Sequence, residues 1–60
     1  MKMVVKFEYE KETSGAHRYM EVDKSGNRLT ASDGAKVGSL YIRKSAIKDA
    51  PDKLTVTITD

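Results

Sequence analysis

The sequence GSLYIRKSAIKDAPDKLTVTI (residues 38–58) contains the two clearest strand patterns of the chain and its only proline. Near its end, in LTVTIT (residues 54–59), every second residue is a large apolar one and the others are threonine. This period of two is typical of a strand with one apolar and one polar face, and β-branched residues pack well on such a pleated surface. We therefore expect a strand over residues 54–59 and a shorter one over residues 40–43.

The segment between these strands, at about residues 44–49, is expected to form one short helical turn. The hydroxyl of Ser45 can accept hydrogen bonds from the free N–H groups at the start of such a turn. Pro51 ends the turn, because proline pushes the residue before it towards extended geometry. Ile47 is the one large apolar residue of the segment, and we expect it to cover one end of the core.

The first part of the chain predicts a β-hairpin. Apolar residues occupy the odd positions of residues 3–9, with Val4 as the exception. The sequence ETSG (residues 12–15) then breaks the alternation and ends in a glycine, which is typical of a tight connection. Residues 16–22 are expected to form the second strand of the hairpin.

The alternation assigns one face of the sheet to the core. Together with Ile47, the side chains expected there are Met3, Val5, Phe7, Tyr9, Met20, Val22, Leu40, Ile42, Leu54, Val56 and Ile58. The opposite face is expected to carry Lys6, Glu8, His17, Tyr19, Glu21, Tyr41, Arg43, Thr55 and Thr57. Arg18 falls among the apolar positions, which requires a sheet edge, where a long side chain can lead its charge to water.

Residues 23–35, DKSGNRLTASDGA, are polar and contain two turn signals, and we interpret them as a loop. In the alternative, a short strand over residues 28–31 turns back into residues 35–37 and makes five strands instead of four. The connections are too short for parallel crossovers, so the strands should be antiparallel. The predicted fold is mainly β: a small antiparallel sheet or open barrel of four to five strands.

The composition is that of one small domain, residues 1–60. Such a domain buries only about 60% of the surface of its unfolded chain, so its sheet must curl into a barrel or pair with a second copy. The absence of cysteine excludes disulfides and thiolate metal sites. With no signal-peptide pattern and no window of about 20 apolar residues, a cytoplasmic location is expected, away from membranes.

No residue pattern points to catalysis or metal binding. His17 is the only histidine and has no carboxylate at metal-ligand spacing. Residues 23–27 resemble the start of a calcium loop, but the glycine is fourth instead of sixth. No serine or threonine is spaced for activation by a base. We expect a protein that is not an enzyme and uses no cofactor, metal or small-molecule substrate.

The polar face is the predicted binding surface. We assign the binding role to Tyr41, Arg43, Lys44, Tyr19, Lys6 and Lys36. The leading hypothesis is a binding protein that contacts a protein partner or a second copy of itself. The alternative is a regulatory protein that binds DNA or single strands, since small β-barrels use aromatic rings among cations to stack bases. A net charge of only +2 permits this alternative without favouring it.

The Arg18-Tyr19 pair, the segment GSLYIRKSAI, Pro51 and the closing LTVTI resemble a group of very short proteins of phages and of mobile regions in actinobacterial genomes. The similar pattern covers most of the chain apart from residues 24–35. This resemblance implies a mobile-element context and no mechanism. A weaker similarity, carried by Arg43, Lys44 and the turn at Ser45, is to swapped-hairpin regulators of the antitoxin type, whose interleaved strands grip DNA. The low net charge departs from that family.

Overall fold

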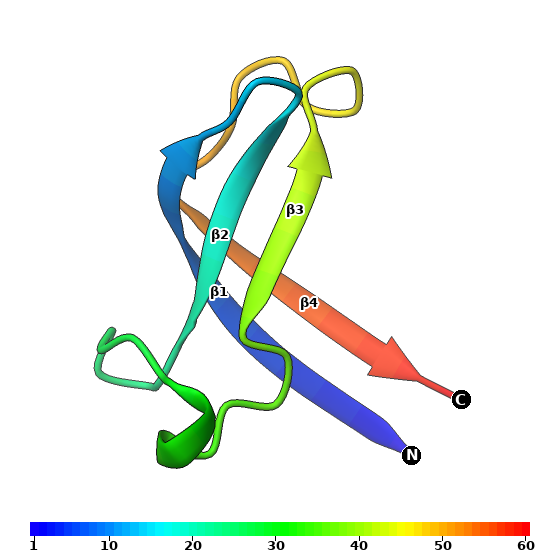
Figure 1. Ribbon diagram of the computed structural model, residues 1–60. Helices are drawn as coiled ribbons and strands as arrows, with labels where there is room; N and C mark the ends of the chain where they lie inside the picture. Colours follow the sequence, from blue (N-terminus) through cyan, green and yellow to red (C-terminus); the bar gives the residue numbers. More distant parts are fainter.

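Strands form where the alternating patterns predict them. The computed structural model describes residues 1–60 and contains β1 (Lys2–Glu12), β2 (Ala16–Val22), β3 (Ser39–Arg43) and β4 (Lys53–Thr59). They form one antiparallel sheet in the order β3-β2-β1-β4, and β1 and β4 cross behind β2 and β3 (Figure 1). The sheet is therefore a curled half-barrel that is not closed between β3 and β4, and the predicted mainly β fold is confirmed.

The curl follows from the length of β1 and from a bulge within it. Residues 2–8 of β1 pair with β4 and residues 6–12 pair with β2, so that only the middle of β1 has a neighbour on both sides. The register with β2 shifts between Tyr9 and Lys11, which leaves Glu10 as an extra residue. A bulge bends its strand and increases the local twist. One strand can therefore belong to both crossed parts of the sheet.

Three aromatic and aliphatic side chains, Val5, Phe7 and Tyr19, form the fully buried core. The ring of Tyr9 packs edge-on against that of Tyr19, with ring centroids 5.3 Å apart. Aromatic side chains remove large apolar areas from water, so a few of them can supply most of a small core. Half-buried side chains surround these three: Met3, Tyr9, Leu40, Ile42, Ala50, Leu54, Val56 and Ile58.

The predicted orientation of β2 is wrong. His17, Tyr19 and Glu21 were expected on the polar face, but all three are buried. Met20 and Val22 were expected in the core, but they are only half-buried and lie on the opposite face. The reason is the register, which places Glu21 beside Phe7 and Tyr19 beside Tyr9. Because side chains alternate along a strand, an error of one residue moves every side chain of the strand to the other face. The alternation does not decide between the two orientations of β2, since both faces carry large side chains.

The buried residues Tyr19 and His17 of β2 each have a hydrogen-bonded polar atom, as burial requires. The hydroxyl of Tyr19 donates to the carbonyl oxygen of Pro51 at 2.7 Å. Nδ1 of His17 lies 3.1 Å from the hydroxyl oxygen of Tyr9. These bonds join β2 to β1 and to the segment before β4. The hydroxyl and imidazole groups thus stabilise the packing of the largely apolar rings that carry them.

The carboxylate of Glu21 organises the end of the loop before β3. It accepts hydrogen bonds from the backbone N–H groups of Lys36, Val37 and Gly38 at distances between 2.7 and 3.1 Å. Burial acts to raise the pKa of this carboxyl, but the three backbone donors and the charge of Lys36 outweigh burial and lower it. Glu21 therefore remains charged although it is buried.

The loop interpretation of residues 23–35 is confirmed for most of the segment. Asp23 closes a first turn by accepting two backbone N–H groups at 2.9 Å. The only 3-10 helix, Ala31–Asp33, follows, and no regular strand forms. One isolated bridge between Val22 and Arg28 is all that corresponds to the predicted alternative of a fifth strand.

The segment after β3 contains a hydrogen-bonded turn at residues 44–46, which is shorter than the helical turn predicted at about residues 44–49. The N–H groups of Ala46 and Ile47 donate to the carbonyl oxygen of Arg43, at 2.9 and 3.3 Å. Ile47 is half-buried and does not join the core cluster, whereas Ala50 packs against it. The predicted role of Ile47 as a cover of the core is therefore wrong.

The half-barrel leaves an unusually large surface in solvent. The chain exposes 4414 Å², whereas a compact protein of 6.7 kDa exposes about 3,900 Å². Its radius of gyration is 11.7 Å, against about 10.4 Å expected for a compact domain of this length. Only five of 60 residues are buried. The structure contains no helix with the length and apolar character that a membrane crossing requires.

Candidate functional site

The structure separates the predicted binding residues into different regions. Tyr41 and Arg43 lie exposed on the outer face of the sheet, which we define as the face opposite to Phe7, and this placement agrees with the prediction. Lys6 lies on the same face of β1, in the row of Val22. The row of Tyr41 contains Arg18, four residues from Val22 along β2, so the two rows lie about 13 Å apart.

Tyr19 does not belong to any binding surface. Its side chain is completely buried, so the prediction that it lies on the exposed face is wrong. Burial in the core raises the pKa of its hydroxyl, with smaller contributions from Tyr9 and Asp52. The residue acts as part of the core, and a partner cannot reach its ring.

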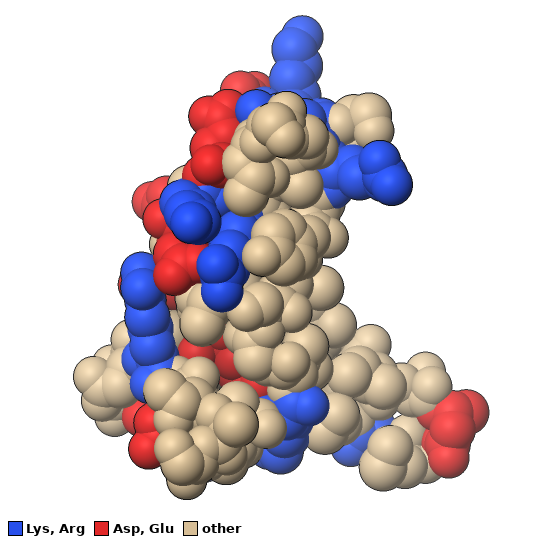
Figure 2. All heavy atoms as spheres, in the orientation of Figure 1, with Lys and Arg blue, Asp and Glu red and all other residues tan.

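An ordered aromatic and cationic pair does exist on the outer face, between Tyr41 and Arg18. The two residues are cross-strand neighbours, and the guanidinium carbon lies 5.7 Å from the centroid of the Tyr41 ring. Arg18 also forms an ion pair with Glu10 at 2.9 Å, and Glu10 contacts Arg28 at 3.2 Å. Figure 2 shows basic and acidic side chains interleaved along one side of the molecule, beside an uncharged central area. This row was missed by sequence reasoning because Arg18 was assigned to the opposite face.

Lys44 is engaged within the chain. Its ammonium lies 2.8 Å from the carboxylate of Glu12, and this hydrogen bond and charge lower the pKa of Glu12. Arg43, by contrast, forms no ion pair. Of the two adjacent cations predicted to bind a partner, only Arg43 is free to do so.

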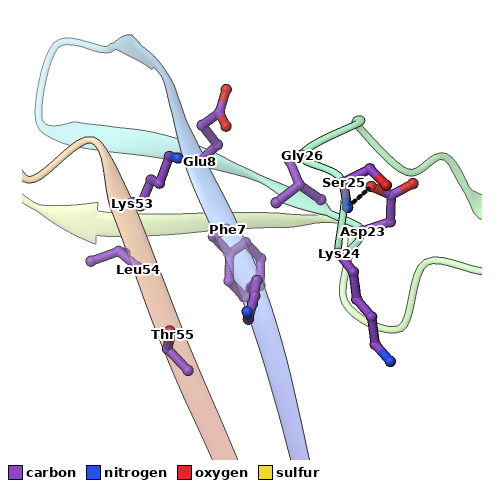
Figure 3. Close-up of a pocket in the computed structure, with 11 residues that line it drawn as sticks. Phe7, Glu8, Asp23, Lys24, Ser25, Gly26, Lys53, Leu54 and Thr55 are labelled. Atoms are coloured by element: carbon purple, nitrogen blue, oxygen red, sulfur yellow. Dashed lines mark hydrogen bonds between the residues drawn. The ribbon is translucent and has the colours of Figure 1, made fainter.

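Lys6 and Lys36 line one cavity of about 550 Å³ between the first half of β1 and the loop before β3. A second groove, of about 280 Å³, is lined by Lys6 and Lys24, which also line the first cavity, and it extends towards Lys53. In Figure 3 this groove lies between β4 and the turn at Asp23, with Phe7 between them. Both grooves are open at the surface and mix lysines with carboxylates. They are suited to weak contacts with an anionic partner more than to enclosing a small molecule.

The ion pairs involve only a minority of the charged side chains. Only Arg18, Arg28 and Lys44 among the eleven lysines and arginines form ion pairs, so eight remain free. Among the nine carboxylates, three form ion pairs and three accept hydrogen bonds from the chain. The free ones are Glu8, Asp49 and Asp52. Hydrogen bonds from neutral N–H groups leave a carboxylate charged, so eight cations and six carboxylates lie outside ion pairs, and their difference equals the net charge of +2.

The backbone of β4 is unpaired along one edge. The N–H of Tyr9 donates to Asp52 at 2.8 Å, and the N–H of Asp60 donates to Met1 at 3.3 Å. Hydrogen-bonded pairs recur at every second residue of an antiparallel ladder, so the even-numbered residues of β4 direct their backbone groups to β1. The odd-numbered residues, Lys53, Thr55, Thr57 and Thr59, direct theirs away from the sheet.

The same reasoning applies to β3. The N–H of Glu21 donates to Gly38 at 2.8 Å, and the N–H of Lys44 donates to Gly15 at 3.1 Å. In this register, Leu40 and Ile42 direct their backbone groups to β2. Ser39, Tyr41 and Arg43 consequently direct theirs outward. The half-barrel has a free edge on each side of its opening.

The inner side chains of the two edge strands are incompletely covered. Leu40 and Ile42 of β3 and Leu54, Val56 and Ile58 of β4 all pack on the core, yet none is fully buried. Apolar side chains and unpaired backbone groups thus occur together at the opening. A polypeptide strand could satisfy both.

No protein-family model matches the chain, and no curated protein or solved structure matches it significantly. No three His, Cys, Asp or Glu side chains come together in a way that could hold a metal ion. The groups that the surface offers are free backbone edges, half-covered apolar side chains and unpaired cations. These groups support binding.

Proposed function

We propose that the protein is a small non-enzymatic binding protein that acts by adding a polypeptide strand to its open half-barrel. The observation that carries this proposal is the opening between β3 and β4, where apolar inner side chains lie beside unpaired backbone edges. Addition of a strand to a sheet edge is a general mode of recognition, in which main-chain hydrogen bonds supply affinity and side-chain pockets supply specificity.

The surface area supports the same proposal. The chain exposes about 500 Å² more than a compact monomer of its mass. A standard protein interface buries about 800 Å² on each partner. An interface of ordinary size would therefore cover more surface than this excess, and the burial would compensate for the small core.

Hydrogen exchange resolved by residue tests the proposal. We expect the outward N–H groups of one free edge, Ser39 and Tyr41 of β3 or Thr55 and Thr57 of β4, to gain protection as the protein is concentrated from micromolar to millimolar, or when a peptide with the sequence of β4 is added. The N–H groups of Phe7 and Val56 lie within the sheet and serve as internal controls. If neither treatment protects any outward amide, the proposal is wrong.

An exposed tyrosine beside an arginine without an ion pair favours nucleic-acid binding as a second candidate. Tyr41 is 56% exposed and is flanked on its strand by Arg43, which forms no ion pair. An exposed ring beside cations can stack on a base while the cations contact phosphates. Affinity for such a partner would fall steeply with salt, because binding releases counterions.

Titration of labelled single-stranded and double-stranded oligonucleotides at two salt concentrations tests this candidate. Arg43→Glu should reduce both the affinity and its salt dependence. Lys48→Glu is the matched control, since it makes the same change of charge at an exposed residue outside the sheet. Equal effects of the two substitutions, or no binding at low salt, would exclude a specific role of the Tyr41 region.

A further inference from the structure

We infer that the strand added to the half-barrel is β4 of a second copy, so that two β4 strands pair antiparallel across a twofold axis that passes between Val56 and Val56 of the second copy. The inference rests on the proposed function and names its partner. It explains which of the two free edges is used, and it specifies one register.

β4 lacks the features that normally prevent edge strands from pairing. Natural edges are protected by central charges, prolines, bulges or short length. β4 has seven residues in unbroken register with β1, its only charge is at its first residue, Lys53, and Pro51 lies before it. β3 has five residues and ends in Arg43. The edge of β4 is therefore the more available template.

The directions of the backbone groups restrict the register. Two edges can form a ladder only if outward-facing residues pair with each other, which here means odd-numbered with odd-numbered residues. Placing Val56 opposite Val56 of the second copy satisfies this condition and pairs all seven residues of β4. A shift by two residues in either direction leaves two residues of each strand without a strand partner.

The side chains agree with this register. Thr55 lies opposite Thr57 of the second copy on the outer face, and Leu54 lies opposite Ile58 of the second copy on the inner face. The half-covered apolar side chains of both copies thus form one continuous strip. Lys53 lies opposite the uncharged Thr59 of the second copy, so no like charges oppose each other. β-Branched pairs of this kind favour sheet pairing.

The lack of cysteine makes a direct test simple, because a single introduced thiol can react only with its copy in another chain. In the proposed register, Val56 and its mate form a pair without mutual hydrogen bonds, with Cα atoms about 4.5 Å apart. This distance lies within the range of about 4.4 to 6.8 Å that a disulfide spans. Val56→Cys should therefore convert to a covalent dimer under mild oxidation of the folded protein.

Thr57→Cys is the matched control. Its thiol lies on the outer face, and residues 57 of the two copies are diagonal neighbours at about 7 to 8 Å, so its disulfide yield should be lost or strongly reduced. A covalent dimer formed faster by Thr57→Cys than by Val56→Cys would overturn the register. Sedimentation of the reduced proteins establishes that each variant retains the association state of the parent.

The test separates failure of the inference from failure of the proposed function. If the parent protein associates but Val56→Cys forms no disulfide dimer, the pairing of β4 with itself is wrong, while strand addition stands. A disulfide between Ile42→Cys and Val56→Cys in mixed samples would then assign the contact to β3 and β4. If the parent stays monomeric at millimolar concentration, with no outward amide protected and no peptide bound, both the inference and the proposed function fail.

Discussion

The two central strands and the two edge strands carry similar alternating patterns but bury their side chains to different depths. Val5, Phe7 and Tyr19, the fully buried core, all come from β1 and β2. The inner side chains of β3 and β4 contact this core and remain half-exposed. A strand in the middle of a sheet has neighbours on both sides, whereas an edge strand has one. Alternation therefore predicts which face a residue occupies, and strand order determines how deeply it is buried.

The largest expected effect is a loss in the free energy of unfolding, and it compares a residue of a central strand with one of an edge strand. Phe7→Ala removes a fully buried ring and should cost about 3 to 5 kcal/mol, which is comparable to the whole stability of a domain of this size. Ile58→Ala shortens a half-exposed side chain of β4 and should cost clearly less. Circular dichroism during urea unfolding measures both. Equal losses in the two variants would contradict the difference between central and edge strands.

Glu21 offers a second test, because it links the buried side of β2 to the loop before β3. Glu21→Gln weakens hydrogen bonds to a charged acceptor and should destabilise the fold by about 1.5 to 3 kcal/mol. Glu8→Gln is the control, since Glu8 forms no ion pair or hydrogen bond within the chain. Similar urea midpoints for the two variants would show that the backbone donors do not stabilise the carboxylate.

The pKa of Glu21 also predicts how stability depends on pH. Its pKa is lower in the folded chain than the usual 4.5, so the unfolded chain binds the proton more readily. The contribution of Glu21 is therefore fully present above pH 4.5 and is lost as the pH falls through the lower, folded value. Urea titrations at a series of acidic pH values should show a smaller loss for Glu21→Gln than for the parent. An identical loss in the two proteins would show that Glu21 does not contribute to the pH dependence of stability.

A smaller effect is expected from the hydroxyl of Tyr19. Tyr19→Phe removes the hydrogen bond to Pro51 that ties the start of β4 to the core, and should cost about 1 kcal/mol. Tyr41→Phe makes the same chemical change on an exposed ring whose hydroxyl has no partner in the chain, and should leave stability unchanged. A loss in Tyr41→Phe equal to that in Tyr19→Phe would contradict the contrast between the buried and the exposed ring.

The smallest effect concerns the pair of Arg18 and Tyr41 on the outer face. A double-mutant cycle with Arg18→Gln and Tyr41→Leu should give a coupling of about 0.5 to 1 kcal/mol, as exposed cation and aromatic pairs do. The ion pair of Arg18 with Glu10 is removed equally in both arms, so it does not enter the coupling. A coupling of zero would show that the two side chains do not stabilise each other.

Some features of the proposed binding surfaces could be predicted from the alternation, and others could not. Tyr41 and Arg43 lie exposed as predicted because β3 has one clearly apolar and one clearly polar set of residues. β2 has large side chains at both its odd and its even positions, so its orientation depends on the register with β1. That register cannot be read from the sequence of β2 alone. The position of Tyr19 in the core and of Arg18 beside Tyr41 follows from that register.

The sequence by itself determined where strands form, where turns interrupt them and that the strands are antiparallel, because these properties depend on side-chain periodicity and on residues near in the chain. Only the tertiary structure decided that β1 lies between β2 and β4, that a bulge at Glu10 curls the sheet, and that three distant backbone groups hold Glu21. These depend on pairings between residues far apart in the chain. The opening between β3 and β4 follows from that strand order.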